Sequence, residues 1–200
     1  MIHYFLRTIC CLLVLILSGC DESSPTAGAR GPSRLAEGNS LLMKKNGMDA
    51  TPFITAGLKE PKTFTADEVD LSYHFEVIGI TVGTTARAYA INDLTPMTSH
   101  VVNDVLGNSA VSVTYCDRSD VARVFTNSKA GKPIDLFTGG WHDHAMLLML
   151  DGTFFSQKAK DLPLEEHPHQ RMSWGEWKLL HPATTIYVSK QQASMHHAPL

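Results

Sequence analysis

Cys116 is the residue that most invites a chemical explanation. It ends the strand-like run AVSVTYC at residues 110–116 and is followed by the polar residues DRSD. Functional side chains are commonly presented where a strand opens into a loop, and a thiolate is both a nucleophile and a soft metal ligand. Arg118 or Arg123 would lower the pKa of this thiol, whereas Asp117 and Asp120 would raise it. The alternative is that Cys116 is a small buried hydrophobe, as free cysteines often are.

Two histidine pairs have a spacing that suits metal binding. His142 and His144 are separated by one residue, so both imidazoles would point to the same side of an extended segment. His167 and His169 repeat the spacing. With Cys116, His142 and His144 would form a soft copper or zinc site. A chain with 10 histidines also produces such pairs by chance, and local spacing fixes no complete set of ligands.

The N-terminus has the pattern of a bacterial lipoprotein signal peptide. Arg7 precedes the apolar run TICCLLVLIL at residues 8–17, whose length of about ten residues is too short to span a bilayer. The run ends in Leu-Ser-Gly-Cys, the lipobox, in which Cys20 receives the lipid. We therefore expect an exported protein, held on the periplasmic face of a membrane by acyl chains on Cys20.

The mature chain would keep one free thiol and a negative net charge. Cys10 and Cys11 would leave with the signal peptide and Cys20 would be acylated, which leaves Cys116 without a disulfide partner. Loss of Arg7 from the 17 lysines and arginines leaves 16 basic residues against 20 acidic ones, a net charge of −4. Nucleic acid is therefore not an expected partner, and the lipid rather than charge would hold the membrane.

The remaining length suits one domain with its own core. The segment after Cys20 is rich in Ser, Pro, Gly and Ala, which is typical of a flexible tether. The expected segments are a signal peptide at 1–19, lipidated Cys20 with the tether at 20–34, a transition segment at 35–65, one β-rich domain at 66–189, and a disordered tail at 190–200 in which His196 and His197 are incidental.

Strand signals dominate the expected domain. Alternating, β-branched and aromatic residues predict strands at 73–82, 86–91, 99–106, 110–116, 121–126, 134–137, 145–150, 153–156 and 184–189. Turn sequences such as Asp151-Gly152 predict hairpins between some of them. Ser173 and Glu176 form a capping box at the start of one helix, which His181-Pro182 ends. The predicted fold class is mainly β or α+β, a twisted antiparallel sheet or partial barrel with one or two short helices.

Four short motifs follow one another within residues 75–188. They are Gly83 with ARAYAI at 86–91, VVND at 101–104, VTYC at 113–116, and SW followed by Trp177 and HP at 173–182. In this order they resemble the bacterial domain-of-unknown-function family numbered 3179. Many members of that family continue the cysteine as C-P-L-C, which is typical of a redox or metal pair, whereas Ser119 replaces the second cysteine here.

The resemblance favours a functional thiol at Cys116 but not a dithiol mechanism. A single-cysteine mechanism would pass through a sulfenic acid or a mixed disulfide with an outside thiol. We expect Asn103, Asp104 and Arg118 to be the neighbours of Cys116 in such a site. The leading hypothesis is therefore a membrane-anchored envelope lipoprotein with thiol-based redox activity or a thiolate ligand at Cys116.

Two alternatives remain open at this stage. One is a copper- or zinc-binding protein that uses Cys116 with His142 and His144. The other is a non-catalytic binding or structural lipoprotein in which Cys116 belongs to the core. The sequence names neither a substrate nor a protein partner.

Overall fold

Three β-sheets and one α-helix make up the residues that the computed structural model describes, 52–127 and 131–189. The strands are β1 (Pro52–Ala56), β2 (Leu58–Lys59), β3 (Phe64–Thr65), β4 (Glu76–Val82), β5 (Thr85–Ala90), β6 (Val101–Leu106), β7 (Ser109–Cys116), β8 (Val121–Asn127), β9 (Phe137–His142), β10 (Ala145–Leu150), β11 (Thr153–Ser156), β12 (Glu165–Glu166), β13 (Gln170–Ser173) and β14 (Thr185–Tyr187). The helix is α2 (Trp174–Leu180), and a 3-10 turn, η1 (Ile91–Leu94), follows β5.

Several sequence predictions fall outside these residues. They are the signal peptide, Cys20, the tether, and the tail with His196 and His197. Within the described ranges, no helix is long and apolar enough to cross a membrane.

The strands form sheet A in the order β1-β9-β10-β11, sheet B in the order β12-β8-β7-β6-β2, and sheet C in the order β13-β4-β5-β14-β3. Most neighbouring strands are antiparallel, but β2 pairs with β6 and β14 with β5 in parallel. The predicted class, mainly β with a short helix, is therefore confirmed. The strands are divided among three sheets rather than forming one sheet or a partial barrel.

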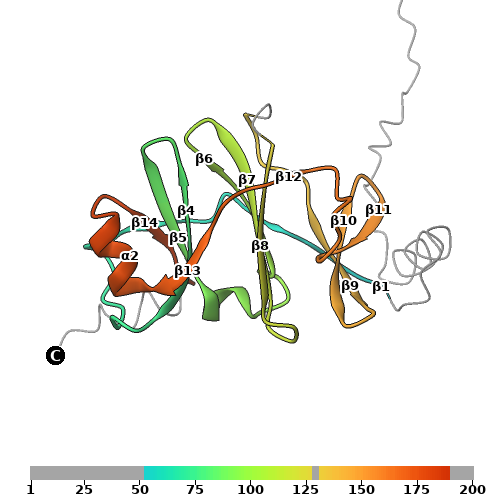
Figure 1. The fold of residues 1–200 in the computed structure, drawn as a ribbon, viewed down its shortest axis with the longest axis horizontal. Coiled ribbons are helices and arrows are strands. Elements are labelled where there is room, and N and C mark those ends of the chain that lie inside the picture. The colour runs from blue at the N-terminus through green and yellow to red at the C-terminus, as the bar shows by residue number, and fades with distance from the viewer. Residues whose placement is uncertain (1–51, 128–130, 190–200) are drawn as a thin grey trace, which may run out of the picture. The chain divides into compact units, whose positions relative to one another are not determined.

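Sheet B lies between the other two sheets (Figure 1). One face of β7, which includes Val113, shares a core with Ile78 of sheet C. The opposite face, which includes Cys116, shares a second core with Met146 of sheet A. Because successive strand residues point to opposite faces, a strand covered on both sides is buried throughout, and every residue from 110 to 116 is buried.

The predicted hairpins are confirmed where a turn sequence joins two patterned runs. Strands β4 and β5, β6 and β7, and β10 and β11 pair in antiparallel registers across two-residue connections. The capping box is also present, because Ser173 accepts a hydrogen bond from the Glu176 backbone and the Glu176 side chain accepts one from the Ser173 N–H. Trp177 of this helix packs on Gly79 of β4 and donates to the Thr184 hydroxyl at 2.8 Å.

Two boundary predictions are corrected. Residues 52–65, expected within a transition segment, supply β1, β2 and β3 to all three sheets, so the folded part begins before residue 66. Two of these strands have only two residues, too few for a periodic pattern. The strand expected at 134–137 begins only at Phe137, because the buried Leu136 gives its carbonyl to the Asn103 side chain at 2.8 Å instead of to a β-ladder.

Candidate functional site

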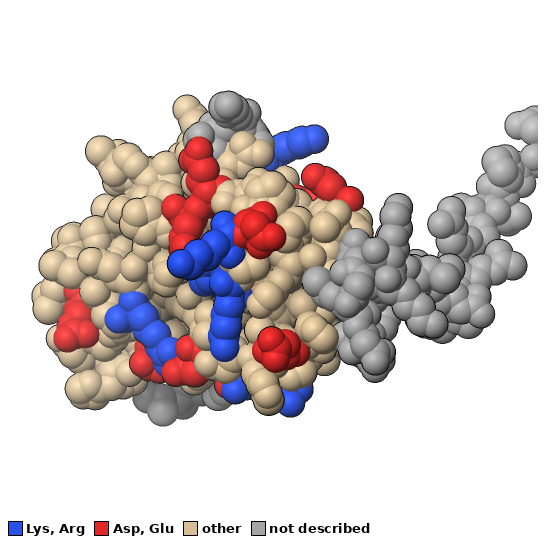
Figure 2. Space-filling view, turned by 45° about the vertical axis from the view of Figure 1, so that its right-hand side comes forward, with Lys and Arg blue, Asp and Glu red and all other residues tan. Residues whose placement is uncertain are grey.

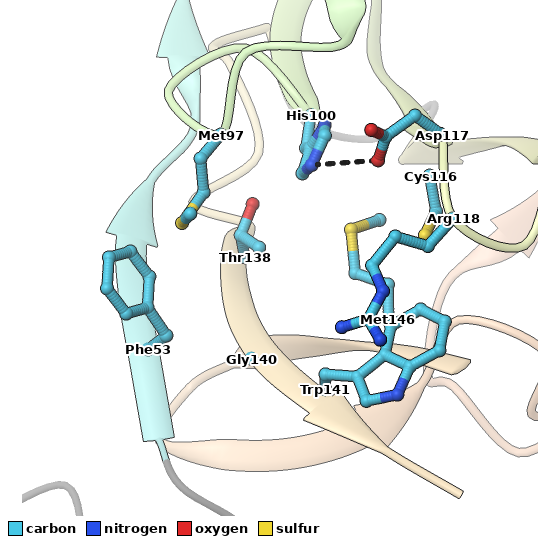
Figure 3. Close-up of a pocket in the computed structure, with 10 residues that line it drawn as sticks. All are labelled: Phe53, Met97, His100, Cys116, Asp117, Arg118, Thr138, Gly140, Trp141 and Met146. Atoms are coloured by element: carbon cyan, nitrogen blue, oxygen red, sulfur yellow. Dashed lines mark ion pairs between the residues drawn. The ribbon is translucent and has the colours of Figure 1, made fainter. Parts of the chain in front are cut away.

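A cavity of about 250 Å³ opens where the end of β7 meets sheet A (Figure 3). Its walls combine the Cys116 thiol, one imidazole, one carboxylate and one guanidinium with aromatic and thioether side chains. The lining residues are Phe53, Met97, His100, Cys116, Asp117, Arg118, Thr138, Gly140, Trp141 and Met146. These residues come from β1, β7, β9 and β10 and from the loops beside β6 and β7.

Cys116 is positioned by the last ladder pair of β7, where it lies opposite Val121 of β8. Its exposed fraction is 2%, and it forms no disulfide. Cys116 is nevertheless one of the residues that line the cavity. The structure thus places the predicted thiol at the boundary between the core that contains Met146 and this cavity.

His100 lies opposite Tyr115, the residue before Cys116, because the β6–β7 pairing continues one step beyond β6. The His100 carbonyl accepts a hydrogen bond from the Tyr115 N–H at 2.9 Å. The ring is oriented by Nδ1, which lies 2.7 Å from the Leu94 carbonyl at the end of η1. A carbonyl can only accept, so Nδ1 carries the proton and Nε2 of the neutral ring carries the lone pair. Nε2 lies 3.7 Å from Asp117 Oδ1.

The loop between β7 and β8 presents Asp117 and Arg118 to the cavity. Asp120 fixes the far end of this loop, because its Oδ1 accepts from the Tyr115 hydroxyl at 2.9 Å and from Arg171 Nη1 at 2.6 Å. The hydrogen bond from Arg171, followed by that from Tyr115, lowers the pKa of Asp120 below its ordinary value. A loop held in this way keeps Asp117 and Arg118 directed to the same opening.

Sheet A contributes the opposite wall. The Arg118 guanidinium lies over the Trp141 ring, with 4.1 Å from its central carbon to the ring centroid. Thr138 and Met146 are buried, whereas Phe53 and Met97 are exposed at 54% and 45%. Figure 3 shows the Met146 sulfur between the Thr138 hydroxyl and the Cys116 sulfur, with His100 above them. The cavity therefore has a buried inner end and an apolar rim.

Asn103 and Asp104, expected as neighbours of Cys116, belong to structural networks away from the cavity lining. Asp104 Oδ2 accepts from Arg87 at 2.6 Å and from the Tyr89 hydroxyl at 2.7 Å between sheets B and C. Burial, followed by the nearby Asp104 charge, raises the pKa of Tyr89 well above its ordinary value. Asn103 accepts from Ser112 at 2.6 Å and, as described above, donates to the segment before β9.

His142 and His144 are not brought together with Cys116. Residue 142 ends β9 and pairs with Ala145, so Asp143 and His144 form the two-residue turn between β9 and β10. Both turn residues have positive φ, 44° and 56°, which suits a type I′ hairpin and not the extended segment that was expected. Asp and His tolerate this backbone region better than most residues.

The described residues contain no group of three His, Cys, Asp or Glu side chains able to hold a metal ion. The second histidine pair is also engaged elsewhere. His167 Nε2 lies 3.0 Å from the Thr81 carbonyl, and His169 Nδ1 lies 3.5 Å from the His167 carbonyl. The histidine spacing in the sequence therefore reflects a turn and a loop.

Ser119, which replaces the second cysteine of the C-P-L-C pattern, does not line the cavity. Its hydroxyl is buried and has no hydrogen-bond partner within the described part of the chain. The site is therefore built around one sulfur nucleophile.

Sequence reasoning missed His100, although the sequence contained a signal for it. The turn at Gly107-Asn108 joins Leu106 to Ser109, and counting the antiparallel pairs back from it places residues 99 and 100 beside the end of β7. The side chains from sheet A had no such signal, because the packing of one sheet on another leaves no fixed spacing in the sequence.

Comparison with known proteins agrees with the motif order. The profile of the family described as "Protein of unknown function (DUF3179)" matches residues 49–197, well over half of the chain. No curated protein and no solved structure matches the chain. The matched region includes every described strand and the whole cavity lining. The chain therefore belongs to the DUF3179 family.

Proposed function

We propose that this chain is a membrane-anchored envelope lipoprotein in which Cys116 is a reactive thiol that forms a mixed disulfide with a small molecule. One observation carries the proposal: the single cysteine of the described region lies at a cavity that is also lined by His100, whose ring is held at Nδ1 by the Leu94 carbonyl and has Nε2 3.7 Å from Asp117 Oδ1. A core cysteine would need neither the cavity nor the histidine. The lipobox at Cys20 supports the anchor and the compartment.

The reaction follows from the groups at the cavity. His100 Nε2 takes the proton of the Cys116 thiol, directly or through one water. The thiolate attacks one sulfur of a small disulfide, the S–S bond of that disulfide breaks, and the departing thiolate takes a proton from solvent. A second small thiol then restores Cys116 by the same exchange. No second cysteine of this chain is required.

Alkylation by iodoacetamide tests the proposal. The detergent-solubilised mature protein is assayed between pH 4 and 9, with Cys116→Ser as the background. His100→Asn keeps a hydrogen-bond donor for the Leu94 carbonyl but removes Nε2. A change in rate in this variant therefore reports on the loss of the proposed base. We expect the rate at pH 7 to fall at least tenfold in His100→Asn, because the variant lacks the imidazole that takes the thiol proton.

The matched control is His169→Asn, which removes an imidazole that does not line this cavity and should leave the rate unchanged. A thiol that reacts only after unfolding would refute the proposal. It would favour the binding or structural role, in which Cys116 is a packing residue.

Copper(I) binding is a second candidate, because the sulfurs of Met97 and Met146 line the same cavity as Cys116 and His100. Thiolate and thioether ligands select copper(I), whereas zinc sites use Cys, His and carboxylate ligands. The His100 ring, held through Nδ1, has the arrangement usual for a metal ligand. The Arg118 guanidinium on the same cavity opposes a bound cation, which is why this candidate comes second.

Anaerobic titration of the protein with copper(I) against a chromophoric chelator separates the two candidates. Binding of one equivalent, weakened at least tenfold by Met146→Leu and unchanged by a double substitution of His142 and His144 to Asn, would establish a copper site at the cavity. Less than about a tenth of an equivalent would eliminate it. Loss of binding only in the histidine double variant would instead place the metal at the turn between β9 and β10.

A further inference from the structure

Arg118 differs from the other arginines of the described ranges, 52–127 and 131–189, in having no carboxylate within ion-pair distance. Arg87 pairs with Asp104, Arg123 with Glu166, and Arg171 with both Glu76 and Asp120. Within these ranges, Arg118 instead stacks on the Trp141 ring. Its guanidinium donors are therefore not committed to another side chain of the described fold.

The position of Arg118 makes this difference informative. Stacking on Trp141 restricts the Arg118 guanidinium to the wall of the cavity, where an unstacked side chain would be free to move in solvent. Asp117 is the one carboxylate of the cavity lining, and its oxygen is directed to His100 at 3.7 Å. A planar guanidinium fork matches a carboxylate in geometry as well as in charge.

Thr138 adds a hydroxyl to the same wall. The residue is 4% exposed and lines the cavity. Figure 3 shows the hydroxyl directed into the cavity. It therefore offers one neutral hydrogen-bonding group to a molecule that enters.

The walls limit the rest of the ligand. The volume of about 250 Å³ is below the roughly 300 Å³ at which pockets for drug-sized ligands begin. Phe53 and Met97 provide apolar contact at the rim. The occupant is therefore small, partly apolar and negatively charged.

We propose that the cavity takes small carboxylate-bearing thiols and disulfides, with the carboxylate on Arg118 and the reacting sulfur at Cys116. This inference rests on the proposed function and adds the class of substrate. Arg118 is then a substrate-binding residue that selects the anion, while the exchange at sulfur is unchanged.

Two alkylating agents that differ in charge test this selection. Iodoacetate and iodoacetamide both alkylate a thiolate at their CH2 carbon and release iodide, but only iodoacetate carries a carboxylate. The rate ratio of iodoacetate to iodoacetamide is measured on the folded protein and on the same protein unfolded in urea. We expect the folded protein to show a ratio about fivefold higher, the factor that one opposite charge at about 4 Å gives in water.

Matched variants assign the effect. Arg118→Gln should return the ratio to that of the unfolded chain, and 0.5 M salt should reduce it in the wild type. Arg123→Gln removes a paired arginine that does not line the cavity and should keep the high ratio. A folded ratio equal to the unfolded one, or a high ratio that survives Arg118→Gln, overturns the anion proposal while iodoacetamide still reports on the reactive thiol.

Quenching of tryptophan fluorescence tests whether the Arg118 charge attracts anions, and it does not depend on the reactivity of Cys116. Of the three tryptophans, Trp174 and Trp177 are buried at 0% and 1% exposure, so quenchers in solution act mainly on Trp141. Iodide is an anion and acrylamide is neutral. We expect Arg118→Gln to lower the quenching constant of iodide at least twofold relative to that of acrylamide. An unchanged relative constant would overturn anion binding at Arg118 even if Cys116 proves inert.

Discussion

Asp104 and Cys116 lie on the same β6–β7 hairpin, yet their surroundings differ in one decisive way. Every hydrogen-bonding oxygen of Asp104 is used within the fold, by Arg87, Tyr89 and the Val105 N–H. Cys116 packs in the core that contains Met146 and also lines the cavity. A buried group whose partners all belong to the protein stabilises it, whereas a thiol at a cavity can meet a ligand. At the scale of residues, this difference supports the role proposed for Cys116 and a structural role for Asp104.

Asp104→Ala should therefore lower stability strongly. It leaves the Arg87 guanidinium, whose side chain is 16% exposed, without its carboxylate. Removing one partner of a buried ion pair costs about 3 kcal/mol. Urea unfolding should show this loss, and a second change, Arg87→Met, should recover part of it. A loss below about 1 kcal/mol would contradict the structural role.

Asp120 gives a pH-dependent prediction. Because its pKa is lowered in the folded state, its contribution is present above the unfolded pKa of about 3.9 and is lost as pH falls through the folded value. The difference in unfolding free energy between the wild type and Asp120→Asn should be constant above about pH 5 and should shrink below about pH 4. Equal differences at pH 3 and pH 6 would show that the Arg171 contact does not act through charge.

At the scale of elements, the crossing from β1 to β2 connects sheets A and B within a few residues. Gly57 is the single residue between the two strands. A Cβ atom there would lie 2.4 Å from Asn103 Nδ2 and 2.6 Å from the Leu136 carbonyl oxygen. The chain can pass so close to another backbone only without a side chain. This crossing also carries Phe53 to the rim of the cavity.

Gly57→Ala should consequently destabilise the fold by about 1–3 kcal/mol, the usual cost of an overpacked core position. Gly131→Ala is the matched control, because a Cβ there meets nothing within 4 Å. Denaturant unfolding of the two variants provides the comparison. Equal midpoints would mean that the crossing can widen without cost.

The elements show how far sequence reasoning extends. Hairpins such as β10–β11 were predictable because a turn sequence and an alternating pattern lie next to each other. Strands of two residues, such as β2 and β12, were not, since they have no period. Cys116 and Arg118 were expected to be neighbours because they lie two positions apart in the chain, and both line the cavity. Trp141 and Thr138 required the packing of sheet A on sheet B, which no local pattern encodes.

At the scale of the whole molecule, the surface and the lipobox bear on partners. Figure 2 shows basic side chains interspersed with acidic ones on the face that it presents. The formal net charge of the full chain is −3. Such a surface does not attract anionic lipid headgroups, so the proposed membrane attachment depends on acylation.

Cys20→Ala should abolish incorporation of a palmitate analogue and leave an uncleaved precursor that is heavier by residues 1–19. Metabolic labelling followed by mass spectrometry of the intact protein measures both effects. Cys10→Ala, within the apolar run, should leave labelling and cleavage unchanged. Label that persists in Cys20→Ala would refute lipidation at Cys20.

The pairing of β14 with β5 and of β13 with β4 has a consequence for biosynthesis. Arg87 and Thr185 face each other across 98 positions of the chain, so sheet C cannot close until almost the entire chain has emerged. Until then, the β4–β5 hairpin exposes two unpaired edges, which invite pairing with other chains. Contacts this distant also slow folding. A chain truncated before Gln170 should therefore aggregate rather than fold into a smaller domain, and newly made full-length chains should depend on holding chaperones during that interval.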